Sequence, residues 1–119
     1  MEDLSTSLPA DSDAARQARA VIGDWADGCD EADRDDVIIA ASELVNDSVR
    51  HSPPGGRVVL KLTSFGSILR VQVIDDSPSR IVSAQSESRN AVRMLDAVAD
   101  DWGVSFAPTQ VWFTARCAA

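Results

Sequence analysis

Residues 42–51 read Ser-Glu-Leu-Val-Asn-Asp-Ser-Val-Arg-His, and Pro-Pro-Gly-Gly follows at 53–56. Apolar side chains recur at helical spacing here and just before it: Val37, Ile38, Ala41, Leu44, Val45 and Val49. This spacing predicts a helix with one face on a core, ended by the prolines and glycines. A second row at i, i+3, i+4 and i+7 is polar: Glu43, Asn46, Asp47 and Arg50. Two interpretations of this row stay open, a site that holds a divalent metal or orients a water, and a solvated helix face.

The size and charge of the chain limit what it can be. Its 119 residues, 45% of them hydrophobic, suffice for one core, so we predict a single domain over residues 1–119. A net charge of −8 is unfavourable for contact with phosphate backbones or anionic lipids, so we expect no nucleic-acid partner and no membrane partner. Much of the acid lies between Asp24 and Asp36. Solvated helix ends and a surface for a basic protein are the two interpretations of that cluster.

The two cysteines, Cys29 and Cys117, lie far apart and belong to no Cys/His cluster with metal-ligand spacing. Such a pair is more typical of free thiols in a reducing compartment than of a disulfide framework. We find no signal peptide and no apolar run long enough to span a bilayer, so we expect a cytoplasmic protein. His51 is the only histidine and no serine lies in a nucleophile-elbow motif, so no Ser-His catalytic triad is predicted.

The periodicity along the chain predicts the order of helices and strands. We expect an extended segment over 4–8, a helix that starts at 11–13 and ends at Gly28, and a helix from near Asp33 to about His51. Period-two alternation then predicts strands over 58–63 and 69–74, joined by a hairpin turn at 64–67. A polar loop reaches about Ser88, and a third helix and two strands over 104–106 and 111–115 follow, with a turn at 108–109 between the strands. The fold class is therefore α/β, a two-layer sandwich whose mainly antiparallel sheet is covered by helices on one face.

Four segments resemble the anti-sigma-factor serine kinases of the GHKL ATPase superfamily. Residues 42–51 are similar to the family's N-box, and residues 71–78, Val-Gln-Val-Ile-Asp-Asp-Ser-Pro, to the strand and acid of its first glycine box. Residues 95–104 resemble its final helix and strand, and residues 111–113 its closing strand. The resemblance covers almost the whole chain and implies the GHKL (Bergerat) two-layer sandwich.

The resemblance also implies roles for individual residues. Glu43 stands at the position of the general base, Asp75 at that of the acid that accepts a hydrogen bond from the adenine amino group, and Asp47 at that of the asparagine that holds Mg²⁺. A carboxylate can bind Mg²⁺, because hard cations favour oxygen ligands. By resemblance, the nucleotide-binding positions are Asn46, Asp47, Arg50, Asp75, Ser77 and Arg89.

The chain departs from the family pattern where phosphate would bind. Asp47 replaces the asparagine, and Asn46 lies one residue earlier, turned by about 100°. Ser77, Ser79, Ser88 and Asn90 stand where the two glycine boxes have glycines. Glycine lets the backbone approach a phosphate without a Cβ, so side chains at all four positions should crowd the cradle.

Three functional hypotheses follow. In the first, the ATP site is degenerate, no cofactor is bound, and the chain regulates transcription by binding proteins in a partner-switching pathway. The resemblance implies a sigma factor or an anti-sigma antagonist as the partner, and a homodimer. In the sequence, the first strand and the exposed sheet face could form the contact between the two copies. In the second, the chain is an active ATP-dependent protein serine kinase and anti-sigma factor with Mg-ATP as its cofactor.

The third hypothesis is an unrelated α/β regulatory or metal-binding domain. Asp75 and Asp76 would then be a metal pair, although a polar strand end that enters a loop is the simpler interpretation. Arg50 and Arg89 are either phosphate contacts or members of surface ion pairs. The three tryptophans are interpreted as core or interface aromatics: Trp25, Trp102 and Trp112.

Overall fold

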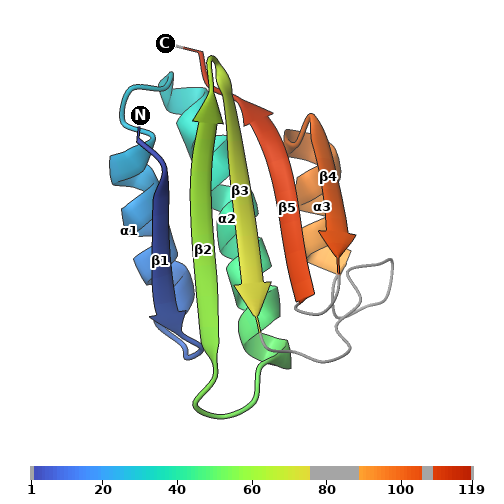
Figure 1. Cartoon of the computed structure of the whole chain (residues 1–119). Coiled ribbons are helices and arrows are strands. Elements are labelled where there is room, and N and C mark those ends of the chain that lie inside the picture. The colour runs from blue at the N-terminus through green and yellow to red at the C-terminus, as the bar shows by residue number, and fades with distance from the viewer. Residues whose placement is uncertain (1, 76–88, 106–108, 119) are drawn as a thin grey trace.

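The computed structural model describes residues 2–75, 89–105 and 109–118, and there five antiparallel strands form one sheet that three helices cover on one face (Figure 1). The strands are β1 (Leu4–Pro9), β2 (Arg57–Phe65), β3 (Ile68–Asp75), β4 (Asp101–Ser105) and β5 (Thr109–Arg116). The helices are α1 (Ala14–Trp25), α2 (Glu31–His51) and α3 (Arg89–Val98). The order in the sheet is β1-β2-β3-β5-β4, so the predicted two-layer α/β sandwich is confirmed.

Period-two alternation in β2 and β3 sets the register of the sheet. Val58, Leu60 and Leu62 are buried under the helices and lie opposite Asp75, Val73 and Val71, which are buried too. A shift of one residue would turn both apolar sets to the other face, so the pattern specifies one pairing. Gly66 in the connecting turn has φ +59°, which glycine adopts without strain.

The central helix, α2, is buried on more sides than one apolar stripe predicts. It contacts α1 and α3 on its flanks and β2, β3 and β5 beneath. Small polar side chains are therefore buried along it, and the Ser42 hydroxyl accepts a hydrogen bond from the Arg19 guanidinium of α1 at 2.9 Å. No helix in the described part of the chain is long and apolar enough to cross a membrane.

Several boundaries differ from the predicted ones by a few residues. α1 ends at Trp25 rather than Gly28, since the Ala26 amide already caps it through the Ile22 carbonyl. β4 begins at Asp101, and Thr109 belongs to β5 rather than to a turn. In both cases pairing with a neighbouring strand extends the element, as Asp75 lies opposite Thr109 and Asp101 opposite Thr114. The predicted loop before Ser88 falls largely outside the described residues.

Cys29 and Cys117 form a disulfide, so the prediction of free thiols is wrong. Their Cα atoms are 5.1 Å apart although 88 residues separate them in sequence. The loop before α2 and the end of β5 meet here, and two further bonds join them. The Asp30 amide donates to the Ala118 carbonyl at 2.5 Å, and the Ala118 amide donates to the Asp33 carboxylate at 2.8 Å.

Reduction of this disulfide should destabilise the fold. A cross-link that closes so long a loop restricts the unfolded chain, which typically contributes about 2–5 kcal/mol. We expect a lower urea midpoint in dithiothreitol than under oxidising conditions. The variant C29S/C117S is the control, and its midpoint should not respond to dithiothreitol. Equal midpoints for oxidised and reduced wild type would contradict the prediction.

Gly103 in β4 touches the ring of Trp112 in β5. A Cβ at Gly103 would lie 2.9 Å from three atoms of the ring, so Gly103→Ala should destabilise the fold by about 1–3 kcal/mol through overpacking. Gly28 is the matched control, because a Cβ there meets nothing within 4 Å and Gly28→Ala should change stability by about 0.5 kcal/mol or less. Urea unfolding of both variants measures the difference, and equal values would refute it.

Candidate functional site

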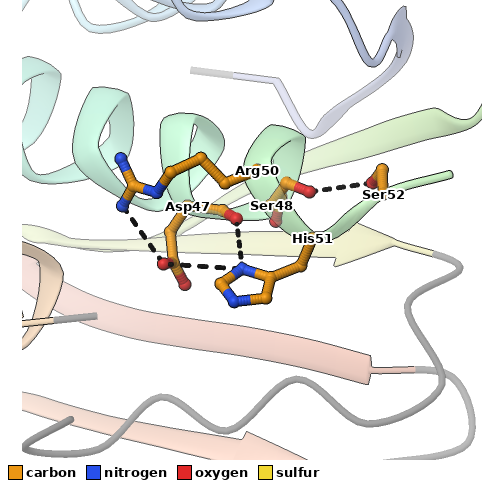
Figure 2. Close-up of polar contacts among 5 residues, drawn as sticks. All are labelled: Asp47, Ser48, Arg50, His51 and Ser52. Carbon is orange, nitrogen blue, oxygen red and sulfur yellow. Dashed lines mark hydrogen bonds and ion pairs between the residues drawn. The ribbon is translucent and has the colours of Figure 1, made fainter. Parts of the chain in front are cut away.

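The polar row on α2 is divided by burial. Asp47 is fully buried, Glu43 is half-buried, and Asn46 and Arg50 are exposed. Because one residue turns a helical side chain by about 100°, Asp47 is buried while Asn46, at the other edge of the same row, is exposed. Figure 2 shows Asp47 and His51 on the same side of α2, with Arg50 reaching back toward Asp47.

Asp47 has partners within its own helix. The Arg50 guanidinium approaches the Asp47 Oδ1 at 3.3 Å, and His51 Nδ1 lies 3.8 Å from the same oxygen. His51 Nδ1 is 2.8 Å from the Asp47 backbone carbonyl oxygen. A carbonyl can only accept a hydrogen bond, so Nδ1 carries the hydrogen and donates it. The hydrogen bond therefore fixes both the tautomer and the orientation of the only imidazole.

The Asp47–Arg50 pair compensates a charge at a place where water does not reach. A buried carboxylate is costly unless a cation or hydrogen-bond donors accompany it. Arg50 supplies the cation from a half-exposed position, since its side chain is 49% exposed. At the end of the same helix, the Ser52 hydroxyl donates to the Ser48 carbonyl at 2.8 Å and satisfies one of its last acceptors.

A second buried acid, Asp75, ends β3. Asp75 and Thr109 are each 2% exposed and lie opposite one another in adjacent strands. In Figure 1, β3 ends and β5 begins at the end of the sheet where α2 also ends. Sequence reasoning predicted Asp75 but missed Thr109, which it assigned to a turn. Thr109 lies two residues before Val111 and four before Phe113, and this period-two spacing could have assigned it to the buried face of the strand.

The remaining predicted residues lie partly outside the described structure. Ser77, Ser79 and Ser88 are not among the described residues. Arg89 and Asn90 begin α3, but only their place in the helix is described. Within residues 2–75, 89–105 and 109–118, no group of three His, Cys, Asp or Glu side chains could hold a metal ion. Asp76, the second member of the suggested metal pair, is likewise not described.

Comparison with known proteins places this arrangement in a family. The sequence profile of the histidine kinase-like ATPase domain matches residues 8–110, from the end of β1 into β5. The chain belongs to the histidine kinase-like ATPase domain family. This membership confirms the GHKL superfamily and removes the hypothesis of an unrelated α/β domain. The family match does not distinguish anti-sigma-factor kinases from other members of the superfamily.

The histidine kinase-like fold also appears in the comparison with solved structures. The chain is similar to the mycobacterial sensor histidine kinase MprB, with a TM-score of 0.52 and 10% identity over 97% of this chain and 99% of that one. At this identity the likeness shows the fold alone. No curated protein matches the sequence.

Mg-ATP is the ligand that this ATPase family implies, and the described residues fit it unevenly. The carboxylate of Asp75, buried at the end of β3, is suited to accept a hydrogen bond from a nucleotide base. Asp47 suits Mg²⁺ poorly, because its carboxylate already faces Arg50 and belongs to no cluster of metal ligands among the described residues. A divalent cation would have to compete with that guanidinium for the same oxygens.

Removal of the Arg50 cation should reveal the cost of burying Asp47. Arg50→Gln should destabilise the fold by about 1–3 kcal/mol, because it leaves a buried carboxylate with weaker compensation. Arg16→Gln is the matched control. Arg16 and Asp13 form the same i, i+3 pair at the same 3.3 Å, but Asp13 is 58% exposed. Loss of the Arg16–Asp13 pair should lower the free energy of unfolding by only about 0–0.5 kcal/mol. Urea unfolding of both variants measures the two losses. Equal losses would show that burial of Asp47 has no energetic consequence.

Proposed function

We propose that this chain is a regulatory protein that resembles anti-sigma-factor kinases but has a degenerate ATP site. It acts by binding proteins in a partner-switching pathway that controls transcription, and it binds no cofactor. The observation that carries the proposal is Asp47, which stands at the metal-binding position of the N-box, fully buried and paired with Arg50.

Charge around Asp47 supports the loss of nucleotide binding. A carboxylate whose charge is offset by a guanidinium attracts Mg²⁺ less than a neutral amide in an open metal site does. Without the metal, the same carboxylate repels a triphosphate. The replacement of four glycines by Ser77, Ser79, Ser88 and Asn90 adds to this, because their side chains crowd a cradle made from backbone N–H groups.

The proposed partner is a sigma factor or an anti-sigma antagonist, and the proposed assembly is a homodimer. We place the protein in the cytoplasm, where such partners act. The Cys29–Cys117 disulfide would then form in a compartment that usually keeps thiols reduced. The oxidation state of these cysteines in cells, measured by thiol labelling, therefore tests the proposed location separately from the function.

An active serine kinase is the second candidate function. Two observations favour it: Glu43 is retained half-buried on α2 at the position of the general base, and Asp75 is buried at the end of β3. Phosphoryl transfer depends mainly on positioning and charge stabilisation, so a loosened phosphate cradle would slow it even if ATP bound.

Thermal unfolding with nucleotide separates the two candidates. A ligand present at 100 times its Kd stabilises a fold by about 2.7 kcal/mol. We expect no magnesium-dependent rise in Tm at millimolar Mg-ATP or Mg-ADP. Asp75→Asn and Glu43→Ala are the control variants. A magnesium-dependent rise that either variant abolishes would overturn the degenerate-site proposal in favour of the kinase.

A further inference from the structure

The face of the sheet opposite the helices differs in charge from the rest of the protein. Side chains that alternate with the buried positions point to this face. Among the described strand residues they include four of the chain's eleven basic residues and, of its nineteen acidic residues, only Asp101. We call the four basic residues together with Trp112 the basic sheet face: Arg57, Lys61, Arg70, Trp112 and Arg116. A chain with net charge −8 thus collects positive charge on one surface.

Within the described residues, this charge is not neutralised by ion pairs. None of the four cations forms a salt bridge with an acidic residue in the described ranges. Arg57 is instead held in place by Ser7 of β1, with its Nε 3.0 Å from the hydroxyl and a terminal nitrogen 3.0 Å from the carbonyl. Lys61, Arg57 and Arg116 are exposed. Their charge is therefore available to a molecule that approaches the sheet.

A rigid aromatic platform lies at the middle of the basic sheet face. The Arg70 guanidinium carbon is 4.9 Å from the centroid of the Trp112 ring. The ring also lies against the backbone of Gly103, where a Cβ would come within 2.9 Å of it. Arg70 Nε is buried and has no hydrogen-bond partner among the described residues. Packing fixes the guanidinium in position, so little side-chain entropy is lost when a carboxylate pairs with its outer nitrogens.

A hollow on the same face adds room for an apolar side chain. It encloses about 310 Å³ where β1 and β2 meet, and it is lined by Asp3, Leu4, Ser5, Lys61 and Thr63. Lys61 borders the hollow. It lies opposite Gln72 of β3, which in turn lies opposite Trp112 of β5, so the three residues form one row across the sheet. One extended or helical segment could place an apolar residue in the hollow and carboxylates along the row of cations.

We propose that the basic sheet face binds an acidic segment of a partner protein. Carboxylates of the segment pair with Arg57, Lys61, Arg70 and Arg116, and one of its apolar side chains packs on Trp112 or in the hollow. The inference deepens the protein-binding function proposed above and rests on it for the class of partner. It assigns that binding to the sheet, away from the helix that carries Asp47.

Charge disfavours the other occupants of this face. A second copy that paired face to face would oppose two sets of four cations with only two acids on each side, Asp3 and Asp101. A second copy that docked its acidic helices here would form an open chain rather than a closed dimer. Duplex DNA carries one charge per about 1.7 Å and extends beyond the face to the acidic remainder of the protein. A short acidic segment avoids that repulsion, because charges more than about 8 Å away are screened at physiological salt.

The test uses the oxidised full-length chain and a fluorescein-labelled 12-residue peptide of glutamate and aspartate with two leucines. The control peptide replaces every acid with its amide. We expect fluorescence anisotropy to show at least tenfold tighter binding of the acidic peptide, weakened by salt. Amide chemical-shift changes should concentrate in β2, β3 and β5.

Charge reversal then tests the residues. The variant K61E/R116E should lose at least tenfold in affinity for the acidic peptide. K61E alone should lose about threefold in affinity for the acidic peptide. This single change keeps the test possible if the double variant does not fold. R16E makes the same charge change at an exposed position on α1, and it should change affinity less than twofold.

Four outcomes would overturn the proposal. These are no binding at millimolar peptide, equal losses in K61E and R16E, shift changes confined to the helices, and tighter binding of a 12-base-pair duplex. Sedimentation that shows a dimer dissociated by K61E/R116E, with no peptide binding, would assign the face to a second copy instead. A magnesium-dependent nucleotide shift would overturn only the degenerate ATP site, so the two proposals fail separately.

Discussion

α2 packs against α1, α3 and three strands at once, and this enclosure governs the polar groups of the fold. Polar side chains on the exposed side of α2, such as Asn46, remain in water, but those on its buried sides do not. Each buried polar group along it must therefore find a partner within the protein. Ser42 bonds with Arg19 of α1, and Asp47 with Arg50 one turn further on. The helix that marks the family is thus also the helix where an uncompensated charge would cost most.

This constraint bears on the fate of the ATP site. An asparagine at position 47 would be neutral, and no cation would be needed to bury it. The aspartate found here adds a charge, and Arg50 lies where it can offset that charge. The result is a buried carboxylate that faces a cation of its own helix, where an asparagine would place a neutral amide. Stability of α2 and affinity for Mg-ATP make opposite demands on the same carboxylate.

The two layers of the sandwich divide the charge of the molecule. Most acids lie on the helices and their connecting loops, whereas the open side of the sheet carries four basic residues around Trp112. β3 belongs to both environments, since alternate residues place Asp75 under the helices and Arg70 on the open face. The disulfide ties the layers together at the opposite end from Asp75, where Cys117 follows β5 and Cys29 precedes α2. One small domain therefore carries the N-box helix on one side of the sheet and a separate basic surface on the other.

Local periodicity in the sequence determined the two-layer class, the course of α2, the β2–β3 hairpin and the positions of Asp47 and Asp75. These depend on contacts between residues close in the chain, and a helical or alternating pattern records them directly. The different directions of Asn46 and Asp47 also followed from helix geometry. Tertiary structure alone decided the pairing of Cys29 with Cys117, the place of Thr109 opposite Asp75, and the stacking of Arg70 on Trp112. Each of these joins segments distant in sequence, and their meeting depends on how the layers pack, which no local pattern encodes.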